Sequence, residues 1–108
     1  FRRIANAELE NNAYFEKPIM FSSEIKDTSD YTIVQGVIDV LFYENDEAVI
    51  VDYKTDRIKE TDETMLKQIV SERHKTQLDL YASALEIAGI KVKEKIVWLI
   101  RSNKAISL

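Results

Sequence analysis

The sequence predicts one α/β domain whose elements follow the order αβββαβ around a mixed central sheet. Two observations indicate this class: three β-prone segments come before a long segment with helical apolar spacing, and a last apolar segment follows that helix. The chain has 108 residues, 45% of them hydrophobic, which suffices for one modest core and not for two. Residues 1–108 are therefore expected to be a single domain, and the first residue, Phe1 rather than Met, indicates part of a longer chain.

The first third of the chain predicts a short helix and an edge strand. Residues 1–13 are rich in Ala, Glu and Asn, which favours a short helix. Aromatic and aliphatic residues recur over 14–25 around Pro18, and a proline inside a strand is typical of a sheet edge. The polar run at 26–31 predicts a turn.

The middle of the chain predicts a β-hairpin. Residues 33–43 and 48–53 are strongly β-prone, and the polar residues 44–47 between them predict a tight loop. If Asn45 and Asp46 form the tip, facing residues have numbers that sum to 91. Residues 57–64 are charged and predict a connection.

The last third predicts a long helix followed by a buried strand. Apolar residues recur at nearly helical spacing over 65–88, and Gly89 is suited to end that helix. Residues 95–101 (KIVWLIR) predict the final strand. The apolar positions expected to form the core are Leu66, Ile69, Val70, Leu78, Tyr81, Leu85 and Ala88.

Composition limits the possible chemistry. No cysteine is present, which excludes disulfides, thiolate zinc sites and iron–sulfur clusters, so a metal would bind through oxygen or through His74. The net charge is −4, and no basic stripe runs through the chain, so a nucleic-acid substrate would need another element to deliver it. No apolar run is long enough for a membrane span, which leads us to expect a cytoplasmic protein. We expect a solvated face from the local run of Lys91, Lys93, Lys95, Arg101 and Lys104.

The predicted hairpin register places Asp39 opposite Asp52. Facing side chains on paired strands lie about 4.5–5.5 Å apart at Cβ, and two like charges at that distance destabilise the pair. A cation between them would remove the conflict, and Mg²⁺ is typically held by one or two carboxylates with water and phosphate. Lys54 shares a strand face with Asp52 and could orient a water or offset phosphoryl charge. A structural ion cluster of the same three residues remains an equal alternative at this point.

Gln77 and Tyr81 lie four residues apart on the predicted helix and therefore share one face. A helical Tyr most often packs in a core with its hydroxyl at the rim. A Gln on that inward face needs a polar partner. The pair therefore favours a polar site beside the helix.

Three segments together resemble the RecB-type nucleases of the PD-(D/E)xK superfamily, in particular the AddA-type nuclease domains of bacterial helicase–nucleases. They are GVID at 36–39, VDYKTD at 51–56 and QLDLYA at 77–82, and YFEKP at 14–18 resembles the segment before the first core strand. The resemblance covers nearly the whole chain, from about Ala13 onward. It implies a restriction-endonuclease-like αβββαβ core.

The resemblance also implies roles for individual residues. Asp39, Asp52 and the backbone carbonyl of Tyr53 would bind Mg²⁺, for which Mn²⁺ can substitute, and Lys54 would be the catalytic lysine. Support for the site on the DNA side would come from Gln77 and Tyr81, and Glu16 matches a recurrent family acid.

Further expectations concern the parent enzyme. The resemblance implies a DNA exonuclease that processes double-strand ends for recombinational repair, with a helicase ATPase elsewhere in the chain feeding it single strands. The partner would be a second helicase/nuclease subunit of the AddB type in a heterodimer, in a nucleoid-associated bacterial complex. The family's upstream metal-binding His has no counterpart in residues 1–13, and His74 does not match it by motif. We therefore expect a partial domain that lacks one metal ligand.

Three alternatives remain. A stand-alone endonuclease or resolvase of the superfamily would share the Asp-x-Lys motif without needing the Gln-x-x-x-Tyr helix. A Cas4-like relative would need a cysteine quartet, which is absent. A catalytically silent docking module would have no reason to keep two opposed acids.

Overall fold

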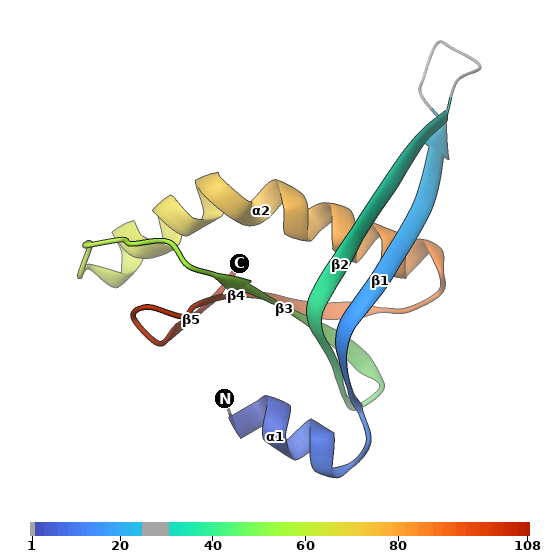
Figure 1. Cartoon of the computed structure of the whole chain (residues 1–108), viewed down its shortest axis with the longest axis horizontal. Coiled ribbons are helices and arrows are strands. Elements are labelled where there is room, and N and C mark those ends of the chain that lie inside the picture. The colour runs from blue at the N-terminus through green and yellow to red at the C-terminus, as the bar shows by residue number, and fades with distance from the viewer. Residues whose placement is uncertain (1, 25–30) are drawn as a thin grey trace.

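The computed structural model describes the backbone of residues 2–24 and 31–108, and the side chains of residues 2–19 and 36–108. A five-stranded sheet has the order β1-β2-β3-β4-β5, and β3–β4 is its parallel pair among antiparallel ones. Helices and a mixed sheet confirm the predicted α/β class (Figure 1). The elements are α1 (Arg2–Leu9), β1 (Ala13–Glu24), β2 (Tyr31–Glu44), β3 (Glu47–Lys54), α2 (Glu63–Ile87), β4 (Val92–Leu99) and β5 (Lys104–Ser107).

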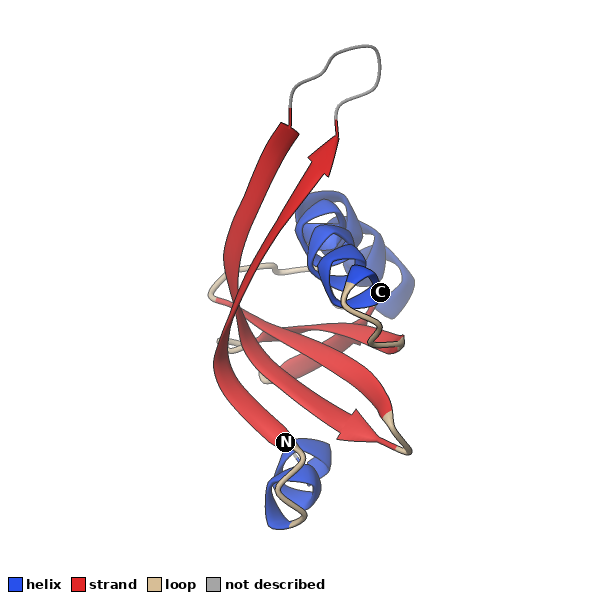
Figure 2. Cartoon of the chain, turned by 90° about the vertical axis from the view of Figure 1, so that its right-hand side faces the viewer, coloured by secondary structure: helices blue, strands red, loops and turns tan. Residues whose placement is uncertain are grey.

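The two helices lie on opposite faces of the sheet. Helix α2 covers one face, and α1 lies against the other (Figures 1 and 2). Each face has its own apolar cluster, because side chains alternate between the two sides of a strand. Leu78, Leu85 and Ile50 belong to the α2 side, whereas Ile4 and Phe42 belong to the α1 side. In the described part of the chain, neither helix is long and apolar enough to cross a membrane.

The hairpin between β2 and β3 follows the predicted register. Glu44 pairs with Glu47 and Tyr43 with Ala48, so the numbers of each pair sum to 91. Asn45 and Asp46 form the tip with φ values of 51° and 66°. Positive φ at both central residues matches the turn type whose twist suits a two-residue hairpin, and Asn and Asp tolerate that conformation.

Helix α2 is fixed at both ends by local hydrogen bonds. At its start, the Asp62 side chain accepts from the backbone amide of Met65 at 3.0 Å, a capping contact that places the start two residues before the predicted one. At its end, Gly89 has φ +88°, and the amides of Gly89 and Ile90 donate to the carbonyls of Glu86 and Leu85. That Schellman arrangement confirms the predicted role of Gly89.

Two expectations need correction or fall outside the described residues. Strand β5 was not predicted, because its four residues KAIS are short and mostly exposed and carry little apolar pattern. It pairs with β4 and leaves β1 at the other edge, as predicted for the strand that contains Pro18. The predicted turn at 26–31 lies outside the described residues except for Tyr31, which already belongs to β2.

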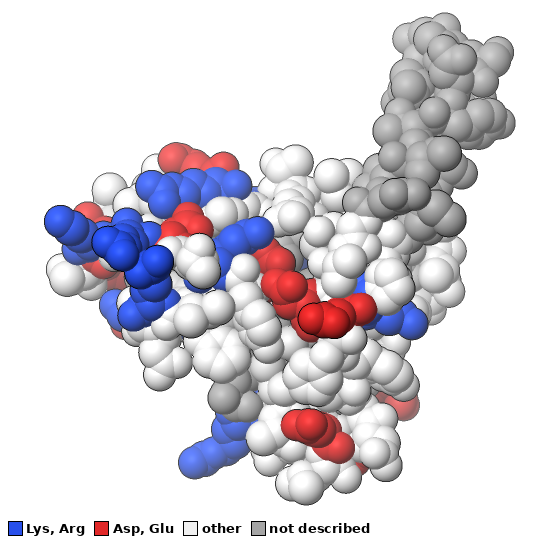
Figure 3. Space-filling model, in the orientation of Figure 1, with Lys and Arg blue, Asp and Glu red and all other residues white. Residues whose placement is uncertain are grey.

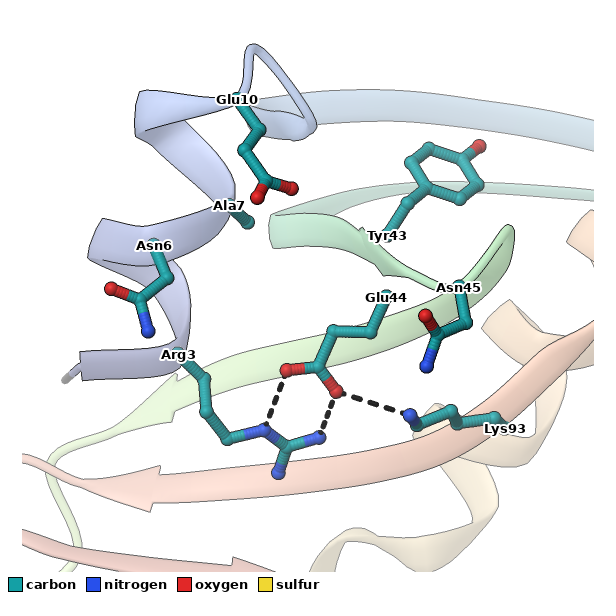
Figure 4. A pocket seen from close by; sticks show the side chains of 8 residues that line it. All are labelled: Arg3, Asn6, Ala7, Glu10, Tyr43, Glu44, Asn45 and Lys93. Atoms are coloured by element: carbon teal, nitrogen blue, oxygen red, sulfur yellow. Dashed lines mark hydrogen bonds and ion pairs between the residues drawn. The ribbon is translucent and has the colours of Figure 1, made fainter.

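Helix α1 is held to the sheet by a charged side chain as well as by Ile4 and Ala7. The Arg3 guanidinium donates to both carboxylate oxygens of Glu44, at 3.1 and 2.7 Å, and to Glu94 at 2.7 Å. Arg3, and to a smaller extent Lys93, lower the pKa of Glu44 to about 2. A cavity of about 390 Å³ opens beside this cluster (Figure 4). It lies at the hairpin tip, at the opposite end of β3 from Asp52.

Candidate active site at the end of strand β3

Strand β2 changes faces at Asp39. Ile38 packs in the cluster on the α2 side, whereas Val40 packs on the α1 side, although residues two apart share a face in a regular strand. The ladder with β3 ends at Val40, and continuing its register by one residue brings Asp39 opposite Asp52. Beyond the ladder, Asp39 Oδ2 accepts a hydrogen bond from the backbone amide of Tyr53 at 2.7 Å. A carboxylate thus takes the place of a backbone acceptor.

Asp52 is the one charged residue that is buried in the described part of the chain, with 4% of its surface exposed. Burial raises the pKa of its carboxyl group, the neighbouring Asp39 raises it further, and Lys54 opposes both effects. The Lys54 ammonium lies 2.7 Å from Asp52 Oδ2, yet this buried oxygen has no aligned hydrogen bond. Keeping such an oxygen charged is costly unless a cation lies beside it.

A chain of polar contacts links Asp52 to helix α2. Lys54 Nζ donates to Gln77 Oε1 at 2.9 Å, and Gln77 Nε2 donates to the Tyr81 hydroxyl at 3.0 Å. Gln77 therefore has a partner at each end of its amide, as its place on the inward face of the helix requires. The structure brings Asp39, Asp52, Lys54, Gln77 and Tyr81 into one connected group. Of these, Tyr81 is also part of the core, with 7% exposed.

Gly36 explains why the first motif contains a glycine. A Cβ atom placed on Gly36 would lie 2.7 Å from Tyr81 Cε1 and 2.9 Å from its hydroxyl oxygen, closer than real Cβ contacts allow. The ring of Tyr81 thus lies directly against the backbone of β2. A position without a side chain on the strand therefore fixes the position of the tyrosine that holds Gln77.

Gly36→Ala should destabilise the protein by about 1–3 kcal/mol, because the added methyl group overpacks a closed contact. Strand propensity alone predicts the opposite sign, since Gly weakens a strand interior. Thermal unfolding measures the change, and Tyr81→Leu provides the matched background. If the contact is responsible, Gly36→Ala should cost much less in the Tyr81→Leu protein than in the wild type. Equal effects in the two backgrounds would contradict it.

A second polar link joins the same strand end to α2. Asp56 Oδ2 lies 2.9 Å from His74 Nε2 and 3.0 Å from Arg73 Nη1. His74, and to a smaller extent Arg73, lower the pKa of Asp56. The sequence pattern did not single out Asp56, although Asp52, Lys54 and Asp56 follow one another at the strand period of two. His74 is partly exposed, as expected, and contacts Asp56 rather than the two opposed acids.

Glu16 is not brought into the group. The pairing of Phe15 with Val40 and of Lys17 with Ile38 places Glu16 beside Asp39 in the register. Glu16 itself, however, is exposed, has φ +53° and makes no ladder pair. Across residues 2–19 and 36–108, no three His, Cys, Asp or Glu side chains lie close enough to hold one metal ion.

The chemistry of the donors nevertheless fits a hard divalent cation. Asp39 and Asp52 offer carboxylate oxygens, one of them buried without an aligned hydrogen bond. Two carboxylates completed by water and substrate phosphate are the usual protein share of a Mg²⁺ site. Carboxylates, an ammonium group and an amide at one strand end can hold a metal ion and a phosphodiester together.

Comparison with known proteins adds independent observations. A family model described as the PD-(D/E)XK nuclease superfamily matches residues 1–105. Relatives named as the A-type subunit of an ATP-dependent helicase/nuclease are 46% identical over 72 residues in Thermoanaerobacter sp. (strain X514), which is 66% of this chain, and 34% identical over 122 residues in Clostridioides difficile (strain 630), which is 97% of it. In Ruminiclostridium cellulolyticum the identity is 36% over 86 residues, 79% of this chain. The matched segments make up 6 to 9% of these relatives.

Proposed function

Because the chain belongs to the PD-(D/E)XK nuclease superfamily, we propose that it is the nuclease domain of an AddA-type helicase/nuclease and cleaves DNA with Mg²⁺. The observation that supports this most is the placement of Asp39, Asp52 and Lys54 at one strand end, linked to Gln77 on α2. The proposed reaction is hydrolysis of a phosphodiester by water, acting as an exonuclease on single strands.

Asp39 and Asp52 would hold the metal ion, together with the backbone carbonyl of Tyr53. When bound, the ion would supply Lewis-acid chemistry, lowering the pKa of a bound water and stabilising charge on the leaving oxygen. Both carboxylates are already fixed before substrate arrives. Asp39 is held by the amide of Tyr53, and Asp52 is surrounded by protein. Such preorganisation avoids rearrangement when the substrate binds.

Lys54 would orient the attacking water and offset the negative charge that develops on the phosphoryl oxygens. Its ammonium group has three protons to donate. One faces Gln77 Oε1 at 2.9 Å, and Asp52 lies at 2.7 Å, which leaves donor capacity for a phosphate or water. Gln77 and Tyr81 act through Lys54 by fixing its position, and Glu16 would at most lie at the rim.

The wider setting is part of the proposal. The relatives' name joins helicase to nuclease, which fits a motor that delivers single-stranded DNA to this domain. Delivery by a motor explains how a domain with a net charge of −4 acts on a polyanion. A second protein of the AddB type, a role in processing double-strand ends for recombinational repair and a place at the bacterial nucleoid complete this setting.

A catalytically silent docking module fits the structure less well. Burying Asp52 next to Asp39 raises the pKa of Asp52, so the pair weakens the metal-free fold. A module without a catalytic metal would gain stability from an apolar or neutral residue there. A stand-alone endonuclease shares the carboxylates and Lys54, but the named relatives are helicase/nuclease subunits.

The exonuclease proposal is tested by comparing linear with circular single-stranded DNA. With Mg²⁺, the whole helicase/nuclease should shorten an end-labelled linear strand progressively and leave a closed circle intact, because an exonuclease needs an end. EDTA should stop the reaction. Gel electrophoresis of the products measures both. Cutting of the circle at a comparable rate would favour the endonuclease alternative, and cleavage in EDTA would refute the metal requirement.

A further inference from the structure

A basic hollow lies directly beyond the strand end that carries Lys54. Its volume is about 300 Å³, and its walls are the loop after β3 and the loop after β4, with the residues Asp56, Arg57, Ile58, Lys59, Arg101 and Ser102. Two hydrogen bonds tie these loops together: the Ile100 amide donates to the Lys54 carbonyl at 3.0 Å, and Arg101 Nε donates to the Thr55 carbonyl at 2.8 Å. The hollow is therefore built onto the end of the same strand as the candidate active site.

The cations of this hollow are not neutralised by neighbouring acids. Among the ion pairs of the described residues, none involves Arg57, Lys59 or Arg101. The one acid of the hollow, Asp56, is already paired with Arg73 and His74. Figure 3 shows basic side chains gathered over the end of the molecule where these loops lie.

The contrast with the lysines around β4 is informative. Lys91, Lys93 and Lys95 each lie within ion-pair distance of an acid: Glu47, Glu44 and Asp79. The basic run noted in the sequence therefore divides into two parts. The lysines from 91 to 95 are paired within the fold, whereas Arg101 is left without an acidic partner and faces the hollow together with Arg57 and Lys59.

We propose that Arg57, Lys59 and Arg101 form a phosphate-binding track that holds the backbone of the single DNA strand next to the phosphodiester at Lys54. The inference rests on the proposed nuclease function and names the path of its substrate. Unpaired cations beside a catalytic centre attract successive phosphates, and a guanidinium can bind a phosphate through two parallel hydrogen bonds. The track binds the backbone and not the base edges, so it does not discriminate between sequences.

The test measures binding separately from cleavage. A fluorescein-labelled oligothymidine is titrated with the 108-residue protein in EDTA, and fluorescence anisotropy gives the association constant at several NaCl concentrations. Each phosphate contact on a single strand contributes about 0.7 to the slope of log K against log salt. The variant carrying Arg57→Ala, Lys59→Ala and Arg101→Ala should therefore lose about 2 from this slope.

Two control variants separate the track from general charge. Arg2→Ala, Lys75→Ala and Lys91→Ala together remove the same charge from exposed positions elsewhere, and this variant should keep most of the slope. Arg57→Lys with Arg101→Lys keeps the charges and should also bind, even if the triple alanine variant folds poorly. Thermal unfolding checks each protein. Equal slope losses in the two triple variants, or wild-type binding that does not depend on salt, would overturn the track.

Two more outcomes distinguish the ligand and the function. Polyglutamate of matched charge should compete weakly; competition as strong as that of unlabelled DNA would overturn the assignment to phosphates. Cleavage by the whole helicase/nuclease is assayed in parallel with Mg²⁺. Track-dependent DNA binding without any cleavage would contradict the proposed nuclease function while supporting the track.

Discussion

Asp52→Ala in the whole helicase/nuclease should lower DNA cleavage by at least about 10²–10³-fold, the usual loss for one transition-state electrostatic group. The variant removes a buried carboxylate from the proposed metal site, and Asp39→Ala and Lys54→Ala should have effects of similar size. ATP-driven unwinding should remain nearly intact, because the motor is expected elsewhere in the parent chain. The measurements are nuclease rate with Mg²⁺ on labelled linear DNA and strand separation by the same preparation.

Matched variants keep this prediction sharp. Asp46→Asn makes the same charge change as Asp52→Asn at the exposed tip of the same hairpin, and it should leave both activities unchanged. Lys91→Ala serves as the corresponding control for Lys54→Ala. Nuclease activity that stays within about threefold of wild type after Asp52→Ala would refute the assignment.

The second large effect concerns stability without metal. Asp52→Asn should stabilise the metal-free protein by an amount on the order of 1 kcal/mol, because it removes a buried charge that faces Asp39. For a domain of this size such a gain corresponds to about 4–8 °C in melting temperature. The expected direction is opposite to that of most core substitutions. Thermal unfolding in EDTA measures it, with Asp46→Asn as the control.

The register of the hairpin could be predicted because local chemistry determines it. A two-residue turn of Asn45 and Asp46 fixes the pairing, and the pairing then fixes that Asp39 lies opposite Asp52. The helical spacing of Gln77 and Tyr81 likewise determines that they share a face. These features depend on neighbours within a few residues, so a sequence pattern contains them.

Other features depend on contacts between distant segments, and no local pattern contains them. The change of face at Asp39 arises because Ile38 and Val40 pack in different clusters. Asp56 gains its role from His74, which lies 18 residues later in the sequence. Pairing with an already formed β4 explains β5, whose residues have little strand signal of their own.

The position of Gly36 shows both situations at once. The glycine is visible in the first motif, and its resemblance to a family motif indicates that a side chain is disfavoured there. The reason becomes clear only in three dimensions, where the ring of Tyr81 occupies the space that a Cβ atom would need. Motifs that are separate in the sequence are thus one packed contact in the fold.

Metal binding by wild type and Asp52→Asn tests the central claim, a divalent-metal site at Asp39 and Asp52, most directly. Melting temperature is followed while Mg²⁺ or Mn²⁺ is added, with isothermal titration calorimetry as a second readout. Wild type should start less stable than the variant and gain stability with metal, by about 2.7 kcal/mol when the ion reaches 100 times its Kd. Asp52→Asn should gain little. Equal metal-dependent shifts in wild type, Asp39→Asn and Asp52→Asn would contradict the site.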